Sequence, residues 1–554
     1  MLLPLPFRNY GPRLQLLWGI VAVHGVNNSH FLLVHPPFLH RNQTGMLNRQ
    51  TRCRAFFALA LILLLVLPPE PARAYSVLSH EQVVDLVWKS HIVPLLRRRY
   101  PTITNDQIKE AHAYAYGGAI IQDIGYYPFG SKLLSDMTHY VRSGDFVSNL
   151  ICEAQNPDEF AFALGALAHY TSDTYGHPAV NRTTASEYPK LRQRYGPEVT
   201  YDENPRAHLQ TEFGFDVLEV VQQRYAPEAF HDFIGFQVAK PVFERAFFDT
   251  YGVPLNQVLT KEDLAISTYR KTVSTLLPKM TQVAVADYGK KMQQAEPTFV
   301  PKKLIYRVNK ADYQKRFGNS YHRPGFGARV LAFTLKLIPK VGPLKDLDLR
   351  VPSADAQKEF LTGMNEVVNR YQQSLDHLAA EPPNHPSLRL PSLDLDTGKP
   401  TAPAEYALAD QTYARYLALL IKPRPPALPP TPSAPWPPPE PVDVQLAGSS
   451  SQSAPPSDGQ PSAFKTVKPA PAAPQQPESA STAADGTRQP TPKPALQPVN
   501  PTIRADVEHY FDHANPGELM LKKDQWKDLP KDLQTLRQLP TAPPDTRAAL
   551  ASQP

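Results

Sequence analysis

Residues 157–178 read PDEFAFALGALAHYTSDTYGHP. Apolar residues recur at helical spacing in this stretch, and proline and acidic residues stand at its beginning, as is typical of the first turn of a helix. His169, Asp173 and His177 follow one another at i, i+4 and i+8, so one face of a continuous helix would carry all three side chains. Pro178 comes next, and we expect it to end the helix.

The same periodicity continues from residue 79 to about residue 292, whereas alternating strand-like patterns are scarce. Another helix start is marked by the sequence Thr104-Asn105-Asp106. Further helices are expected over four ranges: 206–225, 254–292, 353–380 and 402–421. The fold class predicted from these patterns is all-α.

Composition separates a folded part from a proline-rich part. The chain has 554 residues and 61 prolines, and most of the excess proline lies after residue 380. Residues 422–500 are mainly Pro, Ala, Ser and Gln, which cannot bury a core, so we expect a disordered linker there, with PxxP-type partner motifs as the alternative to a plain spacer. The predicted organisation is a helical domain at 75–300, an additional mostly helical region at 301–421, this linker, and a C-terminal tail at 501–554 that is too small to fold alone.

The segment that precedes the helical domain has the composition of a secretory signal. Residues 46–74 read MLNRQTRCRAFFALALILLLVLPPEPARA, with basic residues first, an apolar run next and a small-x-small sequence at the end. The apolar run is shorter than the roughly 20 residues that span a bilayer, which favours a cleaved signal peptide over a membrane anchor. Cleavage near Ala74 would leave Tyr75 as the new amino terminus and would place the protein outside the cytoplasm, either secreted or periplasmic.

Residues 1–45 come before this complete signal peptide, which has a methionine of its own, Met46. We therefore predict that translation begins at Met46 and that residues 1–45 are a non-native upstream extension. Sequencing the amino terminus of the native precursor would test this.

Charge and cysteine content restrict the classes of function. The net charge of +6 is not gathered into a basic stripe, so it does not argue for nucleic-acid binding. Of the two cysteines, Cys53 lies in the expected signal peptide, which leaves Cys152 as a single thiol. The mature chain would have no intramolecular disulfide, and metal ions would have to provide any cross-links.

Other histidines and carboxylates extend the pattern of the first helix. His208 and Glu212 form a second i, i+4 pair on one helical face. Asp123 is expected at the end of a helix, and His139 follows it across a loop. Imidazole and carboxylate groups without thiolates fit zinc in a catalytic site, which keeps a coordination position open for water.

The order of these residues resembles that of the zinc-dependent phospholipase C family, whose fold and metal cluster are shared with the S1/P1 nucleases. The family pattern is an amino-terminal residue, a nearby histidine, then Asp, His, His-x-x-x-Asp, His, and finally His-x-x-x-Glu or His-x-x-x-Asp. This chain supplies every position in order: Tyr75, His80, Asp123, His139, His169, Asp173, His177, His208 and Glu212. Tyr75 stands where the family usually has tryptophan, and residues after about 300 lie outside the resemblance.

The resemblance implies up to three zinc ions. The ligands would divide into three sets: Asp123, His139, His169 and Asp173; His177, His208 and Glu212; and His80, Asp173 and the free amino and carbonyl groups of Tyr75. Asp173 would bridge two of the ions. An uncleaved signal peptide would deny the third ion its amine ligand.

Closely spaced divalent ions stabilise the charge that develops on a phosphoryl group and acidify water, so phosphodiester hydrolysis is the reaction that such a site serves best. The resemblance assigns Asp123 to orienting or deprotonating the attacking water. The leading hypothesis is a secreted, monomeric phospholipase C that acts on phospholipid at a membrane surface and releases diacylglycerol and a phosphorylated headgroup. Tyr126, Tyr127 and Phe129 could line a headgroup pocket by cation–π contact or could be ordinary core residues.

Two other functions are considered. An S1/P1-type single-strand nuclease would have nucleic acid as its substrate, but the lack of disulfides and of a basic stripe favours the lipase. A non-enzymatic, zinc-stabilised envelope module is disfavoured by the complete ligand set, since a structural role needs only closed four-ligand sites.

Overall fold

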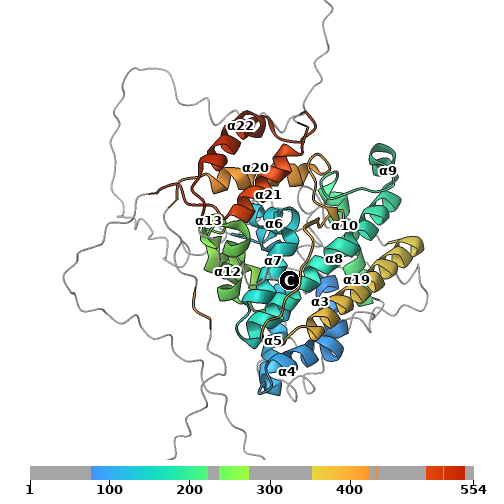
Figure 1. Ribbon diagram of the computed structural model, residues 1–554. Coiled ribbons are helices and arrows are strands. Elements are labelled where there is room, and N and C mark those ends of the chain that lie inside the picture. The colour runs from blue at the N-terminus through green and yellow to red at the C-terminus, as the bar shows by residue number, and fades with distance from the viewer. Residues whose placement is uncertain are drawn as a thin grey trace, which may run out of the picture. The chain divides into compact units, whose positions relative to one another are not determined.

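The computed structural model describes residues 77–221, 236–273, 352–424, 431–433, 494–515 and 517–542. Within these ranges the chain is helical apart from turns and one two-stranded hairpin, which confirms the predicted all-α class (Figure 1). The expected signal peptide, Tyr75 and the upstream extension lie outside the described residues. None of the described helices has the length and apolar character needed to cross a bilayer.

The first part of the described chain forms seven short helices before residue 154. They are α3 (Val77–Val87), the π-helix η1 (Trp88–Ile92), α4 (Val93–Arg99), α5 (Asn105–Gly118), the 3₁₀ helix η2 (Ile121–Tyr126), α6 (Lys132–Tyr140) and α7 (Ser143–Glu153). The start of α5 is the predicted one, and a capping box between Thr104 and Gln107 explains it: each residue's side chain accepts a hydrogen bond from the other's backbone N–H. Asp123 was expected at a helix end but lies inside η2, because α5 already ends at Gly118.

Helix α8 (Pro157–Glu187) is the longest described helix, and it contains residues 157–178 with His169, Asp173 and His177. The prediction that Pro178 ends this helix was wrong, because α8 continues for nine residues beyond it. A proline inside a helix costs about 3 kcal/mol or more. Tertiary contacts offset this cost: most residues after Pro178 stay buried, Thr184 donates to the Thr211 hydroxyl of the later helix at 205–221 at 3.1 Å, and Asn181 donates to the carbonyl of Asp396 at 2.9 Å.

Helix α8 packs mainly against α5 and against the late helix α19 (Ala354–Ala380) (Figure 1). Gly118 permits the close approach of α5, since a Cβ atom there would lie 1.9 Å from the Phe162 carbonyl oxygen. On the other side, the hydroxyl of Tyr371 on α19 donates to the Leu164 carbonyl at 2.8 Å. The core therefore joins residues that are about two hundred positions apart in the sequence.

The remaining helices in the middle of the chain are α9 (Pro189–Tyr195), α10 (Pro205–Val221), α12 (Lys240–Tyr251), α13 (Leu255–Val258) and α14 (Glu262–Lys271). Helices α10 and α19 match the predicted ranges within the described residues. The helix predicted at 254–292 is instead divided into α13 and α14, because the buried Leu259 adopts a non-helical backbone (φ −113°, ψ 76°). Residues 274–292 lie outside the described residues.

The C-terminal part contains the hairpin β1 (Leu393–Asp394) and β2 (Lys399–Pro400), followed by α20 (Ala407–Leu420), α21 (Pro501–Asp512) and α22 (Lys523–Gln538). The helix expected from residue 402 begins only at Ala407. Most of the proline-rich linker, 434–493, lies outside the described residues. Helix α20 packs on α6, and α22 packs on α20, so the C-terminal residues join the same core (Figure 1).

Candidate metal centre

Five elements carry the candidate ligands predicted from the sequence. His80 lies on α3, Asp123 on η2, His139 on α6, His169, Asp173 and His177 on α8, and His208 and Glu212 on α10. None of these eight residues is more than 2% exposed. The ninth candidate, Tyr75, lies outside the described residues.

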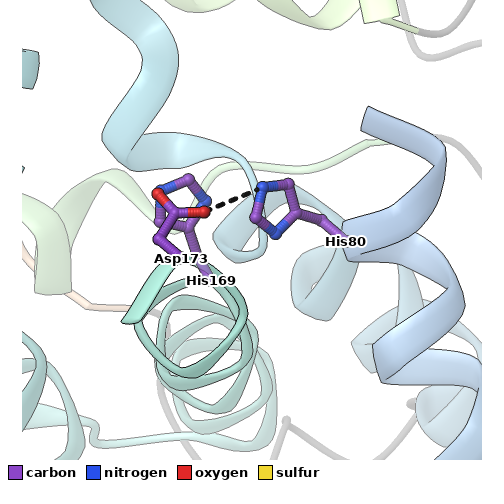
Figure 2. Close-up of side chains that lie close together, drawn as sticks. All are labelled: His80, His169 and Asp173. Carbon is purple, nitrogen blue, oxygen red and sulfur yellow. Dashed lines mark ion pairs between the residues drawn. The ribbon is translucent and has the colours of Figure 1, made fainter. Parts of the chain in front are cut away.

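The structure brings the eight side chains together in three groups, within each of which the ligand atoms lie within 4.8 Å of one another. The groups are His80, His169 and Asp173; Asp123, His139 and His169; and His177, His208 and Glu212. His169 thus takes part in two groups, whereas the sequence assigned it to one. Figure 2 shows the first group, with His80 on α3 facing Asp173 and His169 on α8.

Asp173 lies at the centre of the arrangement. Its Oδ2 atom is 3.1 Å from Nε2 of His169 and 3.3 Å from Nε2 of His139. Its Oδ1 atom is 3.5 Å from Nε2 of His80 and 3.6 Å from Nε2 of His177. One carboxylate therefore faces imidazoles from all three groups, as a bridging ligand would.

The third group has a carboxylate of its own. Oε1 of Glu212 lies 3.0 Å from Nε2 of His208 and 3.3 Å from Nε2 of His177. His208 and Glu212 are one turn apart on α10, as their i, i+4 spacing predicts, and His177 reaches them from α8.

In their neutral form, three histidines present an unprotonated nitrogen to the centre. Nδ1 of His139 donates to the Ser135 carbonyl at 2.7 Å, and Nδ1 of His169 donates to the Ala119 carbonyl at 2.9 Å. Nδ1 of His177 donates to the carbonyl of Leu395 at 2.9 Å. Because a carbonyl can only accept, the proton of each neutral ring is on Nδ1, and Nε2 keeps its lone pair. Histidine ligands of metals are commonly held by such a second hydrogen bond.

Several oxygens of the centre have no hydrogen-bond donor among the described residues: Asp123 Oδ1, both carboxylate oxygens of Asp173 and both of Glu212. Nε2 of His139 and Nε2 of His169 face each other at 3.4 Å, and in the two neutral rings both of these atoms carry a lone pair, so they cannot form a hydrogen bond. Buried carboxylates are costly unless a positive charge compensates them. Divalent ions with nitrogen and oxygen ligands would satisfy both features, so these residues fit zinc.

Without a cation, protons would have to supply part of the positive charge. Burial acts to lower the pKa of His139, but Asp123 and Asp173 raise it to about 10. Burial likewise opposes a charged His177, but Asp173 and Glu212 raise its pKa to about 10. Zinc binding would then release protons from these rings, because a metal ligand must be deprotonated.

Sequence reasoning missed the hairpin, which supplies the Leu395 carbonyl to His177. Its sequence, LDLDTGKP at 393–400, contains an alternating apolar–acidic pattern followed by a glycine, which is a hairpin signal. Nothing in that pattern indicates which distant histidine it contacts. The three aromatic candidates separate in the structure: Tyr126 and Tyr127 are buried in the core, while Phe129 is 54% exposed, with the ammonium of Lys261 5.7 Å from its ring centroid.

Residues 79–260 match the family model described as zinc dependent phospholipase C. This segment resembles the zinc-dependent phospholipase C family. The match covers every described candidate ligand and confirms the resemblance drawn from the order of the ligands. No curated protein and no solved structure matches the chain.

The phospholipase C match supports a zinc-dependent hydrolase that acts on phosphodiester bonds of phospholipids. The hairpin and helices α19 to α22 lie outside the matched segment, although the hairpin contacts His177 directly.

Proposed function

We propose that the protein is a secreted phospholipase C that uses up to three zinc ions to hydrolyse phospholipids to diacylglycerol and a phosphorylated headgroup. The observation that carries the proposal is the set of three buried ligand groups, two of which share His169, with a histidine of each facing Asp173. All eight described ligands fall inside the segment that matches the family. A single structural zinc would need only four of them.

Bound zinc would supply Lewis-acid stabilisation of the phosphoryl oxygens and would lower the pKa of a water molecule. The chain's own residues would fix this chemistry in place. Asp173 would link the groups, because its two oxygens face different histidines. His177, His208 and Glu212 would hold an ion on the side of α8 that faces α10. The amino group of Tyr75 would complete the set around His80 after removal of the signal peptide.

Asp123 is the proposed proton acceptor. Its Oδ1 atom lies 3.4 Å from Nε2 of His139, and the side chain is almost completely buried. A carboxylate at this edge of the centre can orient a water molecule and take a proton from it as the oxygen attacks phosphorus. The exclusion of bulk water strengthens the electrostatic interactions on which the reaction depends.

The test is hydrolysis of phosphatidylcholine, beside single-stranded DNA, by protein that begins at Tyr75, with and without a chelator. Phosphocholine release that requires zinc would support the proposal, whereas nucleotide release alone would assign the protein to the nuclease branch. Failure to bind zinc would contradict both.

Asp123→Asn should lower kcat for phosphocholine release by about 10²-fold or more, the usual range for loss of a general base. Asp136→Asn is the matched control. Asp136 is an equally buried aspartate on α6, but its oxygens bind Lys132 and Arg415 rather than the metal centre. An equal loss in both variants would point to damage of the fold instead of loss of the base.

A further inference from the structure

The hairpin at 393–400 lies against the metal centre, although it is more than two hundred residues from His177 in the sequence. The peptide groups of Leu395 contact ligands of two different groups. Its N–H donates to the carbonyl of His139 at 3.2 Å, and its carbonyl accepts from Nδ1 of His177 at 2.9 Å. A single hairpin residue therefore links the backbone of α6 to a ligand side chain of α8.

Asp396 adds a buried carboxylate behind the same imidazole. Its Oδ1 atom lies 3.7 Å from Nδ1 of His177, and its side chain is buried. Its Oδ2 atom accepts from the hydroxyls of Tyr140 at 2.7 Å and Tyr406 at 2.6 Å. The backbone carbonyl of Asp396 accepts from the Asn181 side chain, one turn beyond His177 on α8. The carboxylate therefore cannot turn away from His177 without breaking its hydrogen bonds with Tyr140 and Tyr406, while Asn181 holds the backbone of Asp396 in place.

Contacts on either side of Asp396 hold the hairpin in place. The hydroxyl of Ser143 donates to the Leu393 carbonyl at 2.6 Å and accepts from the Leu393 N–H at 3.0 Å. At the turn, Gly398 has φ +70°, and a Cβ atom there would lie 2.3 Å from the carbonyl oxygen of Thr174. Thr174 directly follows Asp173, so the turn contacts α8 next to the carboxylate that faces histidines of all three groups.

We propose that Asp396 is a positioning residue for the ion held by His177, His208 and Glu212, and that the hairpin is a required part of the metal centre. The proposal rests on the proposed function insofar as those three residues bind zinc. A carboxylate behind a histidine ligand fixes the orientation and tautomer of the ring and raises its basicity as a ligand. Asp396, with the Leu395 carbonyl, occupies this place for His177.

The test compares Asp396→Asn, Tyr406→Phe and wild type as full-length protein processed to Tyr75. Zinc affinity is measured by competition with a chelator, and the coordination geometry is followed by the visible absorption of the Co²⁺-substituted protein. Asp396→Asn should weaken one of the bound ions by about 10- to 100-fold, as is usual for loss of an outer-shell partner, and should change the Co²⁺ spectrum. Tyr406→Phe, which keeps the carboxylate but removes one of its donors, should produce a smaller change in the same direction.

Tyr510→Phe is the matched control, because the Tyr510 hydroxyl also donates to a buried aspartate, Asp410, at 2.7 Å, and the other hydrogen bonds of the Asp410 carboxylate are from the backbone N–H groups of Ala404 and Met520 instead of from a candidate ligand. It should leave zinc affinity unchanged. In a His208→Ala background, which removes the same ion, Asp396→Asn should produce no further loss of zinc. Added zinc should restore kcat in Asp396→Asn while KM for the phospholipid stays unchanged.

Wild-type zinc affinity in both Asp396→Asn and Tyr406→Phe would overturn the proposal. An equal weakening of every bound ion, reproduced by Tyr510→Phe, would also overturn it, since the hairpin would then only support general packing. If Asp396→Asn does not fold, Tyr406→Phe decides between these outcomes. The zinc measurements do not depend on phospholipid hydrolysis, so a failure of the proposed activity with selective loss of one ion would leave this inference standing.

Discussion

Helix α8 and the β1–β2 hairpin both act on His177, yet they differ in what the sequence can say about them. Helix α8 presents His177 by spacing alone, since residues four apart on a helix share a face. The hairpin contacts Nδ1 of the same ring from 218 positions away. One of these relations is local in the sequence and the other is distant, although both involve the same ring. The comparison teaches that local spacing sets which residues can be ligands, whereas distant segments set how those ligands are oriented.

The same division holds for α6. His139 lies inside the segment that matches the phospholipase C family, but α20, which packs on this helix, lies outside it. The guanidinium of Arg415 on α20 reaches the buried Asp136 of α6 at 3.0 Å. Residues after the matched segment therefore support two of the helices that carry ligands.

The largest effect on activity is expected from a substitution in helix α8. Asp173→Asn removes a charge that faces four imidazoles within 3.6 Å. Because metal-ion stabilisation of the transition state is worth several kcal/mol, kcat/KM should fall by about 10³-fold or more. More than one zinc should be lost, and metal analysis of the purified variant measures this.

The control for Asp173→Asn is again Asp136→Asn, which should bind zinc like the wild type. Full zinc content and activity in Asp173→Asn would show that the central carboxylate does not bridge ions, and would leave α8 without the role that its spacing predicts.

More of the candidate metal centre than of the surrounding fold could be predicted from the sequence. Eight candidate ligands could be named because i, i+4 pairs and residue order are local properties, and the structure gathers all eight. The sharing of His169 between two groups could not be predicted, since it depends on how α3 and α6 approach α8. The role of Leu395 was inaccessible for the same reason: a backbone carbonyl has no sequence signature.

The fold predictions failed where packing outweighs local preference. Pro178 was expected to end α8, but the helix continues beyond it because the residues that follow are held in buried contacts. The end of α5 at Gly118 follows close backbone packing against α8, which no single-helix pattern reveals. The tail, which we expect to be too small to fold alone, forms α21 and α22, and both helices pack on the shared core.

An intermediate effect is expected from Gly398→Ala, which strains the hairpin without touching a ligand. A side chain at φ +70° that also meets the Thr174 carbonyl should lower the free energy of unfolding by about 1–3 kcal/mol. Zinc affinity should fall as well, because the turn contacts α8 beside Asp173. Chemical denaturation and chelator competition measure the two effects.

Gly252→Ala is the control for this strain. Gly252 also has a positive φ, +66°, but it follows α12, and a Cβ atom there would meet only the flexible ends of Ile503 and Leu420. This variant should lose stability and keep its zinc affinity. If both variants weaken zinc binding alike, the hairpin has no special relation to the centre.

The last effect concerns the charge of the hairpin itself, and it is measured in stability instead of zinc affinity. Burial, with a contribution from the neighbouring Asp396, raises the pKa of Asp394 to about 8. Because the folded-state pKa lies above the unfolded value, the protonated form stabilises the fold, and this contribution is lost as pH rises through 8. The free energy of unfolding should fall by at most about 1.4 kcal/mol per pH unit between about pH 5 and pH 8 from this group.

Asp394→Asn should flatten that part of the stability profile, since an amide cannot ionise and its side-chain oxygen can still accept the Asp396 N–H. Thermal unfolding of both proteins from pH 5 to pH 9 is the measurement. The difference between them should grow with pH, because only the wild type has to place a second negative charge beside Asp396. A difference that stays constant would mean that Asp394 is ionised throughout, and that the hairpin tolerates the two carboxylates of Asp394 and Asp396 without a shared proton.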